Sequence, residues 1–160
     1  MSMLTDQASL SRHADKLESF LDRGGLLVVN GHMAYPLLAD VAPFLPQSGH
    51  GTDALAVHRL ADHPVFAGVA EEDLTFRRGV AGFYGRGHNP PPDGAIALNG
   101  LGAGKVALDW LWRRPKGGTV FMHGGLDLWA YAGDPTSAAR MAPQLLNWLK
   151  SEMRGETCDA

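Results

Sequence analysis

The chain has 160 residues, of which 45% are hydrophobic and 19% charged, and its formal net charge is −3. This length is typical of one domain with its own core, and the composition excludes a disordered chain. A pI near 6.1 lacks the basic surface of a nucleic-acid-binding domain. No apolar run approaches the roughly 18 residues that span a bilayer, and the start has no signal-peptide pattern. We therefore expect a soluble, cytoplasmic protein with no nucleic-acid or membrane partner.

Cysteine and histidine usage excludes several kinds of chemistry. The single cysteine, Cys158, lies in a polar tail over 155–160, so we expect one α/β domain over 1–154 without a disulfide, a cysteine metal cluster or a cysteine nucleophile. None of the seven histidines pairs at the i, i+4 spacing of a helical zinc site. We expect neither a metal nor another cofactor.

Helical spacing of apolar residues predicts a first helix that ends at the glycine pair Gly24 and Gly25. The continuous apolar run over 26–30 predicts a central strand covered on both faces. A short helix within 36–44 and a second strand over 54–58 are expected next. The apolar face of the first helix consists of Leu10, Ala14, Leu17 and Leu21.

The middle of the chain is less regular. We expect an apolar turn over 63–69 and a short strand over 74–77. Residues 79–94 contain too much glycine and proline for regular structure, which predicts a long surface loop. Its length favours a binding role, and the alternative is a loop whose aromatic side chains dock onto the core. Between residues 77 and 116 the chain holds seven basic residues against two acidic ones. This excess favours a local attraction for anions, and solvated surface charge is the alternative.

Three strands over 95–99, 105–112 and 119–123 are separated by short glycine-rich turns, which predicts antiparallel hairpins. The turn GLGAGK lacks the spacing of a phosphate loop. Asp134 and Pro135 are expected to start the last helix as its cap and first-turn proline. The apolar face predicted for that helix consists of Ala138, Met141, Leu145, Trp148 and Leu149.

Three stretches together resemble the class I glutamine amidotransferase-like superfamily, in its ThuA-like, non-amidotransferase branch. They read LESFLDRGGLLVVNGH, HPVFAGV and GGTVFMHGGLDLW. The resemblance implies a three-layer α/β sandwich of the flavodoxin-like type, with a mixed sheet whose later strands are antiparallel.

The chain departs from this family in three ways. The loop after the first strand reads VNGHM, without the family's cysteine, which excludes glutamine hydrolysis by the family route. The family's late histidine is commonly followed two residues on by glutamate, whereas His123 is followed by Gly124 and Gly125. The family's first strands are also missing, so we expect an exposed sheet edge and self-association into a homo-oligomer; the alternative is that the chain is part of a larger assembly.

The candidate site lies at the strand ends, where ligands bind in α/β folds. Imidazoles there suit acid–base chemistry, and aromatic rings beside a carboxylate suit a sugar-like ligand. We expect binding of a small polar molecule, sugar-like or anionic, with possible histidine chemistry; the alternatives are hydrogen-bonded structural histidines and a non-catalytic oligomerising or scaffolding subunit. The candidate catalytic residues are His123, Asp127 and His32, and the candidate ligand-binding residues are Tyr84, Arg86, His88 and Trp129.

Overall fold

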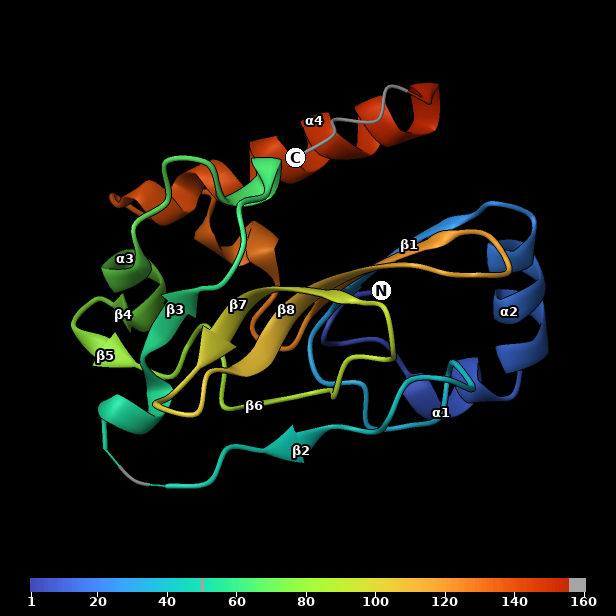
Figure 1. Ribbon diagram of the computed structural model, residues 1–160. Helices are drawn as coiled ribbons and strands as arrows, with labels where there is room; N and C mark the ends of the chain where they lie inside the picture. The colour runs from blue at the N-terminus through green and yellow to red at the C-terminus, as the bar shows by residue number, and fades with distance from the viewer. Residues whose placement is uncertain (50, 156–160) are drawn as a thin grey trace.

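The structure, a computed structural model, describes residues 1–49 and 51–155. It is a mixed α/β fold built around one five-stranded sheet (Figure 1). No helix in the described residues is long and apolar enough to cross a membrane. Cys158 and most of the predicted tail lie outside the described residues.

The sheet has the strand order β1-β9-β8-β7-β3. Strands β1 and β9 run parallel, and every other neighbouring pair is antiparallel. This confirms the mixed sheet with antiparallel later strands. Its strands are β1 Leu26–Asn30, β3 Val57–Arg59, β7 Ile96–Leu101, β8 Val106–Arg113 and β9 Thr119–His123. Four two-residue strands form separate small ladders: β2 Leu45–Pro46 with β6 Gly87–His88, and β4 Phe76–Arg77 with β5 Val80–Ala81.

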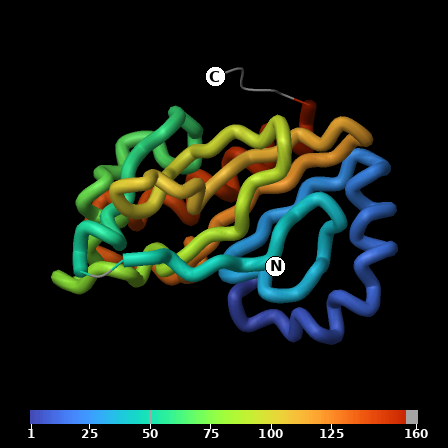
Figure 2. Tube along the Cα trace, turned by 60° about the horizontal axis from the view of Figure 1, so that its bottom comes forward, coloured from blue at the N-terminus to red at the C-terminus, as the bar shows by residue number. Residues whose placement is uncertain are grey.

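Helical segments and long connections cover the two faces of the sheet. Figure 1 shows α4 along one face, while the connections that carry β2 and β6 run along the other. Figure 2, turned to bring that second side forward, shows α1, α2 and the cyan connection in front of the sheet. The α-helices are α1 Gln7–Ser11, α2 Ala14–Asp22, α3 Glu71–Thr75 and α4 Met141–Arg154. The 3-10 turns are η1 Asp53–Leu55, η2 Pro64–Phe66, η3 Leu128–Tyr131 and η4 Ser137–Arg140.

The sheet separates two apolar cores. On the α4 side, Leu111 and Phe121 pack with Met141, Leu145 and Trp148. This confirms the inward face predicted for the last helix. On the other side, the buried residues are Leu21, Val29, Met33, Leu37, Leu38, Val41, Trp110, Trp112, Val120 and Met122.

Strand β1 has the predicted bounds but lies at the edge of the sheet and is only partly buried, so its prediction as a central strand is wrong. An apolar run shows that side chains avoid water; it does not show that both backbone edges are paired. Met1 covers part of the open edge. Its amino group donates to Val28 O at 2.6 Å, and Asn30 N–H donates to Met1 O at 2.8 Å.

Several predicted helices differ from those observed. The first helix is broken into α1 and α2 around Arg12 and His13. Residues 36–44 form turns, with a proline at Pro36 and another at Pro43; proline removes a backbone donor and disfavours helix in the residue before it. Residues 71–75, partly predicted as strand, form α3.

The last helix also begins later than predicted. Asp134 does not cap it, because its carboxylate pairs with Arg77, with Nε and Oδ2 2.6 Å apart. Helix α4 begins at Met141, after the 3-10 turn η4. It ends at Gly155, whose positive φ of 72° suits glycine.

Residues 79–94 are mostly irregular, as predicted, but they do not form a simple surface loop. Tyr84 is 1% exposed and Asn89 is 0% exposed. The Asn89 backbone carbonyl accepts the indole N–H of Trp110 at 2.9 Å, and its side chain hydrogen-bonds the backbone of Met33 and Ala42. The segment is therefore part of the layer that covers the sheet.

Candidate functional site

His123 ends β9 and is fully buried at the strand ends. Its Nδ1 atom lies 2.5 Å from Oδ1 of Asp109 on the neighbouring strand β8. The register places Asn99 of β7 opposite Asp109, and Asp109 opposite His123. The sheet itself therefore brings the three polar side chains into one row.

Tyr84 joins this row from the covering loop. Asp109 Oδ2 accepts the Tyr84 hydroxyl at 2.6 Å and Asn99 Nδ2 at 2.5 Å. Burial, followed by the neighbouring Asp109 carboxylate, raises the pKa of Tyr84 well above its usual value, so the phenol stays protonated and donates. We call Tyr84, Asn99, Asp109 and His123 the strand-end network; each of its side chains is at most 1% exposed.

Both ring nitrogens of His123 face acceptor atoms. Nε2 lies 2.8 Å from the carbonyl oxygen of Leu126, and a carbonyl only accepts, so Nε2 carries a hydrogen. Nδ1 and Asp109 Oδ1 share a second hydrogen bond. His123 thus has no free lone pair to take a proton from a ligand, which general-base chemistry requires.

Gly125 occupies the position at which the resemblance would place a glutamate. A Cβ atom there would lie 1.5 Å from the carbonyl oxygen of Tyr84, so no side chain fits. The carboxylate beside His123 comes instead from Asp109, on the adjacent strand.

Asp127, predicted to work with His123, binds the beginning of the chain. Its Oδ1 atom accepts the backbone N–H of Met3 at 2.8 Å, and its Oδ2 atom accepts the hydroxyl of Ser2. Gly31, beside the end of β1, is also in close contact with this segment, since a Cβ there would lie 2.7 Å from Met3 Cα. The first three residues therefore cover this end of the sheet.

His32 lies near His123 but is engaged elsewhere. It stacks on Phe44 with ring centroids 3.8 Å apart. Burial, and secondarily the charge of His123, lower the pKa of His32 below its usual value. The structure thus brings the two predicted histidines into one region without a direct hydrogen bond between them in the described residues.

In the described residues, no hydrogen bond joins the other three predicted ligand-binding residues, Arg86, His88 and Trp129, to the strand-end network. Arg86 is exposed and donates to the carbonyl of Gly82 at 3.0 Å. His88 has a buried Nδ1 without a hydrogen-bond partner in the described residues, and burial lowers its pKa. Trp129 is 41% exposed. None of the three lines the cavity described next.

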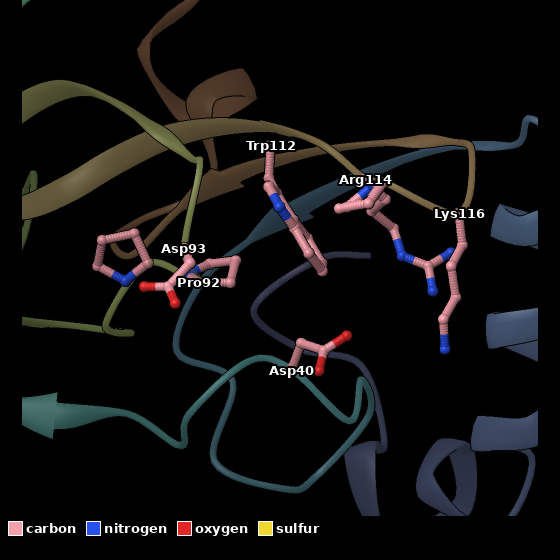
Figure 3. Close-up of a pocket in the computed structure, with 8 residues that line it drawn as sticks. Asp40, Pro92, Asp93, Trp112, Arg114 and Lys116 are labelled. Carbon is pink, nitrogen blue, oxygen red and sulfur yellow. The ribbon is translucent and has the colours of Figure 1, made fainter.

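A cavity of about 470 Å³ lies on the sheet face opposite α4, around Trp112 of β8. Figure 3 shows the indole between Pro92 and Asp93 on one side and Arg114 and Lys116 on the other, with Asp40 beyond its outer edge. We call this the Trp112 cavity. Its lining residues are Asp40, Pro91, Pro92, Asp93, Trp112, Arg114, Pro115 and Lys116.

Arg114 forms one wall of the Trp112 cavity and is held by helix α2. Its side chain is 4% exposed, with Nη2 lying 2.5 Å from Glu18 Oε2 and Nη1 lying 2.9 Å from Asp22 Oδ1. Its guanidinium carbon lies 5.7 Å from the ring centre of Trp112, a cation–π contact. Two carboxylates therefore compensate the single charge of Arg114.

Trp112 itself has an unsatisfied polar atom. The residue is 4% exposed, and its Nε1 is buried without an acceptor among the residues described. By contrast, Trp110, two residues earlier, donates to Asn89 O. A buried N–H without a partner costs about 1–3 kcal/mol relative to a hydrogen-bonded one. This atom is shielded from solvent, so it lies beneath the cavity surface and a ligand would reach it only if the indole moved.

Sequence reasoning missed both the partners of His123 and this cavity. A lone carboxylate inside the apolar run VALDWLW was the available signal for Asp109. The alternation over 106–112 that contains Trp112 is typical of a strand packed on both faces and gives no sign of a cavity. No group of three or more potential metal ligands was found in residues 1–49 and 51–155.

Comparisons with known proteins give no match: no family model, no curated protein and no solved structure is similar to this chain.

Proposed function

We propose that this chain is a binding domain for a small polar molecule, that its ligand occupies the Trp112 cavity, and that His123 is structural rather than catalytic. The cavity itself, which charged side chains line beside the indole of Trp112, carries the proposal. Small-molecule sites are typically cavities of about 300–1,000 Å³ with a few polar groups on their walls. The cavity beside Trp112 supplies the space.

The contacts at the strand ends favour this site over the one predicted from sequence. His123 uses both ring nitrogens internally, and Asp127 binds Ser2 and Met3. A ligand at the strand ends would have to displace these contacts, whereas the Trp112 cavity is already open. A distant relationship to the ThuA-like proteins remains part of the proposal, and it rests on the three sequence stretches given above.

A thermal-shift screen of metabolites tests the proposal, using wild type, Trp112→Phe and Trp129→Phe. Phenylalanine keeps an aromatic ring but is smaller than the indole, so it changes the part of the cavity wall that Trp112 forms. A ligand that raises the Tm of wild type and of Trp129→Phe, but not of Trp112→Phe, would support the cavity. A ligand whose effect persists in Trp112→Phe and vanishes in His123→Ala would instead place the site at the strand ends.

A second candidate function, self-association, is favoured by the open edge of β1. A groove of about 860 Å³ runs along that edge, and its apolar lining includes Phe20, Leu149 and Met153. Met153 is 81% exposed. Because Met1 already hydrogen-bonds Val28 and Asn30, the start of β1 is the part left for pairing with a second copy. A two-fold contact there would bury these side chains.

Light scattering after size exclusion tests self-association, with Met153→Glu as the disrupting variant. A dimer in wild type that becomes a monomer in Met153→Glu would support pairing at β1. Lys105→Glu, which lies in the turn between β7 and β8 outside the groove, serves as the charge control. A wild-type monomer at high micromolar concentration would rule this candidate out.

A further inference from the structure

We propose that Asp93 is a site of spontaneous covalent modification. Its side chain closes a cyclic imide with the backbone nitrogen of Gly94, the imide opens to isoaspartate, and the conversion reshapes one wall of the Trp112 cavity. Asp93 and its neighbour Pro92 both line that cavity. The inference does not depend on which molecule the cavity binds.

A glycine after the acidic residue makes this reaction feasible. The ring forms when the next backbone nitrogen attacks the side-chain carbonyl carbon. A side chain on the next residue hinders that approach, whereas glycine leaves it open and gives the backbone more conformations. The chain has three places where aspartate or asparagine precedes glycine, and they begin at Asn30, Asp93 and Asn99.

Asp93 and Gly94 are exposed and lie in the turn that precedes β7. One hydrogen bond closes this turn, from Ala95 N–H to Pro92 O at 3.1 Å. In the described residues, no hydrogen bond or ion pair involves the Gly94 N–H or the Asp93 carboxylate. A Cβ atom at Gly94 would meet nothing within 4 Å, so the peptide has room to rotate toward the side chain. The two groups that must join are therefore both accessible and unoccupied.

The two asparagines that precede glycine are protected by the sheet. Asn30 is 2% exposed and Asn99 is 0% exposed. The N–H of Gly31, which would attack Asn30, donates to His123 O at 2.8 Å. The side-chain amide of Asn99 donates to Asp109 Oδ2 at 2.5 Å. Neither asparagine can close its ring unless this part of the core opens first.

The reaction needs nothing besides water. The Gly94 nitrogen forms a bond to Cγ of Asp93, one C–O bond of the carboxyl group breaks, and the oxygen leaves as water with the amide hydrogen. Water then adds to one of the two imide carbonyls, and the C–N bond of that carbonyl breaks. Opening at Cγ restores aspartate. Opening at the main-chain carbonyl leaves Gly94 attached to Cγ, which is isoaspartate.

Isoaspartate changes the backbone of the cavity wall. The main chain now passes through Cβ and Cγ, so it gains one methylene group, and the carboxylate is carried by Cα. The turn has little freedom to absorb this extra atom, because Pro92 has a fixed φ on one side and β7 begins at Ile96 on the other. We therefore expect both Pro92 and the carboxylate to change position beside Trp112.

Peptide mapping of aged protein tests the modification. Folded wild type, urea-unfolded wild type and folded Asp93→Glu are incubated at neutral pH and physiological temperature and digested with trypsin. Cleavage after Arg86 and Lys105 gives one peptide that contains both Asp93 and Asn99. Deamidation of Asn99 raises the mass of this peptide. Isomerisation of Asp93 leaves the mass unchanged and is identified by electron-transfer fragmentation.

We expect isoaspartate to form at position 93 of the folded wild type at least about tenfold faster than Asn99 deamidates, because strands of the core open rarely. In the unfolded protein Asn99 should react as well, since nothing then holds its amide. Asp93→Glu keeps the charge at an exposed position but would have to close a six-membered ring, which forms far more slowly. No isomer should accumulate in that variant.

Indole ¹⁵N spectra of fresh and aged protein test the effect on the cavity. The chain has four tryptophans, and Trp112→Phe identifies the signal of Trp112. Aged wild type should show a second Trp112 signal in proportion to its isoaspartate content. Aged Asp93→Glu should keep a single one.

The two measurements have separate negative outcomes. Isoaspartate at position 93 that forms no faster than Asn99 deamidates in the folded protein would overturn the modification site. Isoaspartate together with a single, unmoved Trp112 signal would overturn the reshaping of the cavity. Neither result affects the thermal-shift test of the proposed function, which uses freshly prepared protein.

Discussion

His123 and Asp109 face each other on adjacent strands, with Nδ1 and Oδ1 2.5 Å apart and neither residue exposed to solvent. A contact of this kind can orient a catalytic imidazole, but here the opposite nitrogen of the ring is bound to Leu126 O. Because Tyr84 and Asn99 also bind Asp109, one carboxylate joins β7, β8, β9 and the covering loop. The strand-end network is therefore expected to stabilise the fold.

Replacing the Asp109 carboxylate tests whether the strand-end network stabilises the fold. Asp109→Asn leaves the size of the side chain unchanged but puts an amide N–H₂ against donors that need an acceptor. We expect it to lower the free energy of unfolding by about 3–5 kcal/mol, as for other broken buried pairs. Tyr84→Phe removes the hydroxyl that donates to Asp109 and accepts from Asn99, and it should cost about 1–2 kcal/mol. Urea denaturation followed by circular dichroism measures the unfolding free energy of both variants. A smaller loss for Asp109→Asn than for Tyr84→Phe would contradict the prediction.

Gly125 should not tolerate even a methyl group. In Gly125→Ala the new Cβ would lie 1.5 Å from the backbone oxygen of Tyr84, so the covering loop must move and the strand-end network must open. We expect a loss of at least about 3 kcal/mol in unfolding free energy. Gly133→Ala is the matched control, because nothing lies within 4 Å of its added Cβ. Similar melting temperatures for the two variants would show that the loop adapts freely.

The burial of His63 predicts that the stability of the fold depends on pH. Its ring lies among Phe66, Phe121 and Trp148, and burial lowers its pKa from 6.5 to about 4. Because the folded-state pKa is below the unfolded one, the neutral ring stabilises the fold fully above pH 6.5. That contribution is lost as the pH falls from 6.5 toward 4. The loss should be on the order of 2–3 kcal/mol.

His63→Asn tests this dependence. His63 Nδ1 accepts the N–H of Val65, and asparagine can accept the same bond without titrating. The variant is expected to be less stable at pH 7, since it loses the ring contacts, but its unfolding free energy should fall less steeply between pH 6.5 and 4. Parallel slopes for wild type and variant in urea titrations would contradict the assignment.

Arg114 lines the Trp112 cavity and should also stabilise the fold through its ion pairs with Glu18 and Asp22 of α2. Arg114→Met keeps the apolar part of the side chain and removes both ion pairs, leaving Glu18 and Asp22 without their cation. We expect a cost of about 2 kcal/mol, which should shrink in high salt. Lys116→Met, at an exposed position, should change stability by less than about 0.5 kcal/mol. Equal effects of the two substitutions in thermal melts would overturn this interpretation.

Patterns confined to one segment predicted much of the sheet. The apolar runs at 26–30 and 119–123 gave the bounds of β1 and β9, and glycine turns gave the β7-β8-β9 hairpins. Position in the sheet was harder, because an apolar run does not reveal that β1 lies at an edge. The turns over 36–44 and helix α3 were missed because short segments take their conformation from the surfaces they cover.

In the candidate sites too, residues marked by a local sequence pattern could be predicted, whereas contacts between residues far apart in the chain could not. His123 could be found because it follows a buried strand. Its partner Asp109 comes from the neighbouring strand, and the register that pairs them cannot be derived from either strand alone. The Trp112 cavity combines residues near 40, 92 and 114, which only the folded chain brings together.

Helix α2 connects the two surfaces proposed to bind other molecules. Its Glu18 holds Arg114 at the Trp112 cavity, and its Phe20 lines the groove beside β1. If ligand binding shifted α2, it would shift the groove as well, and by thermodynamic reciprocity dimer formation would then change ligand affinity by the same factor. Such coupling would make the apparent ligand affinity depend on protein concentration.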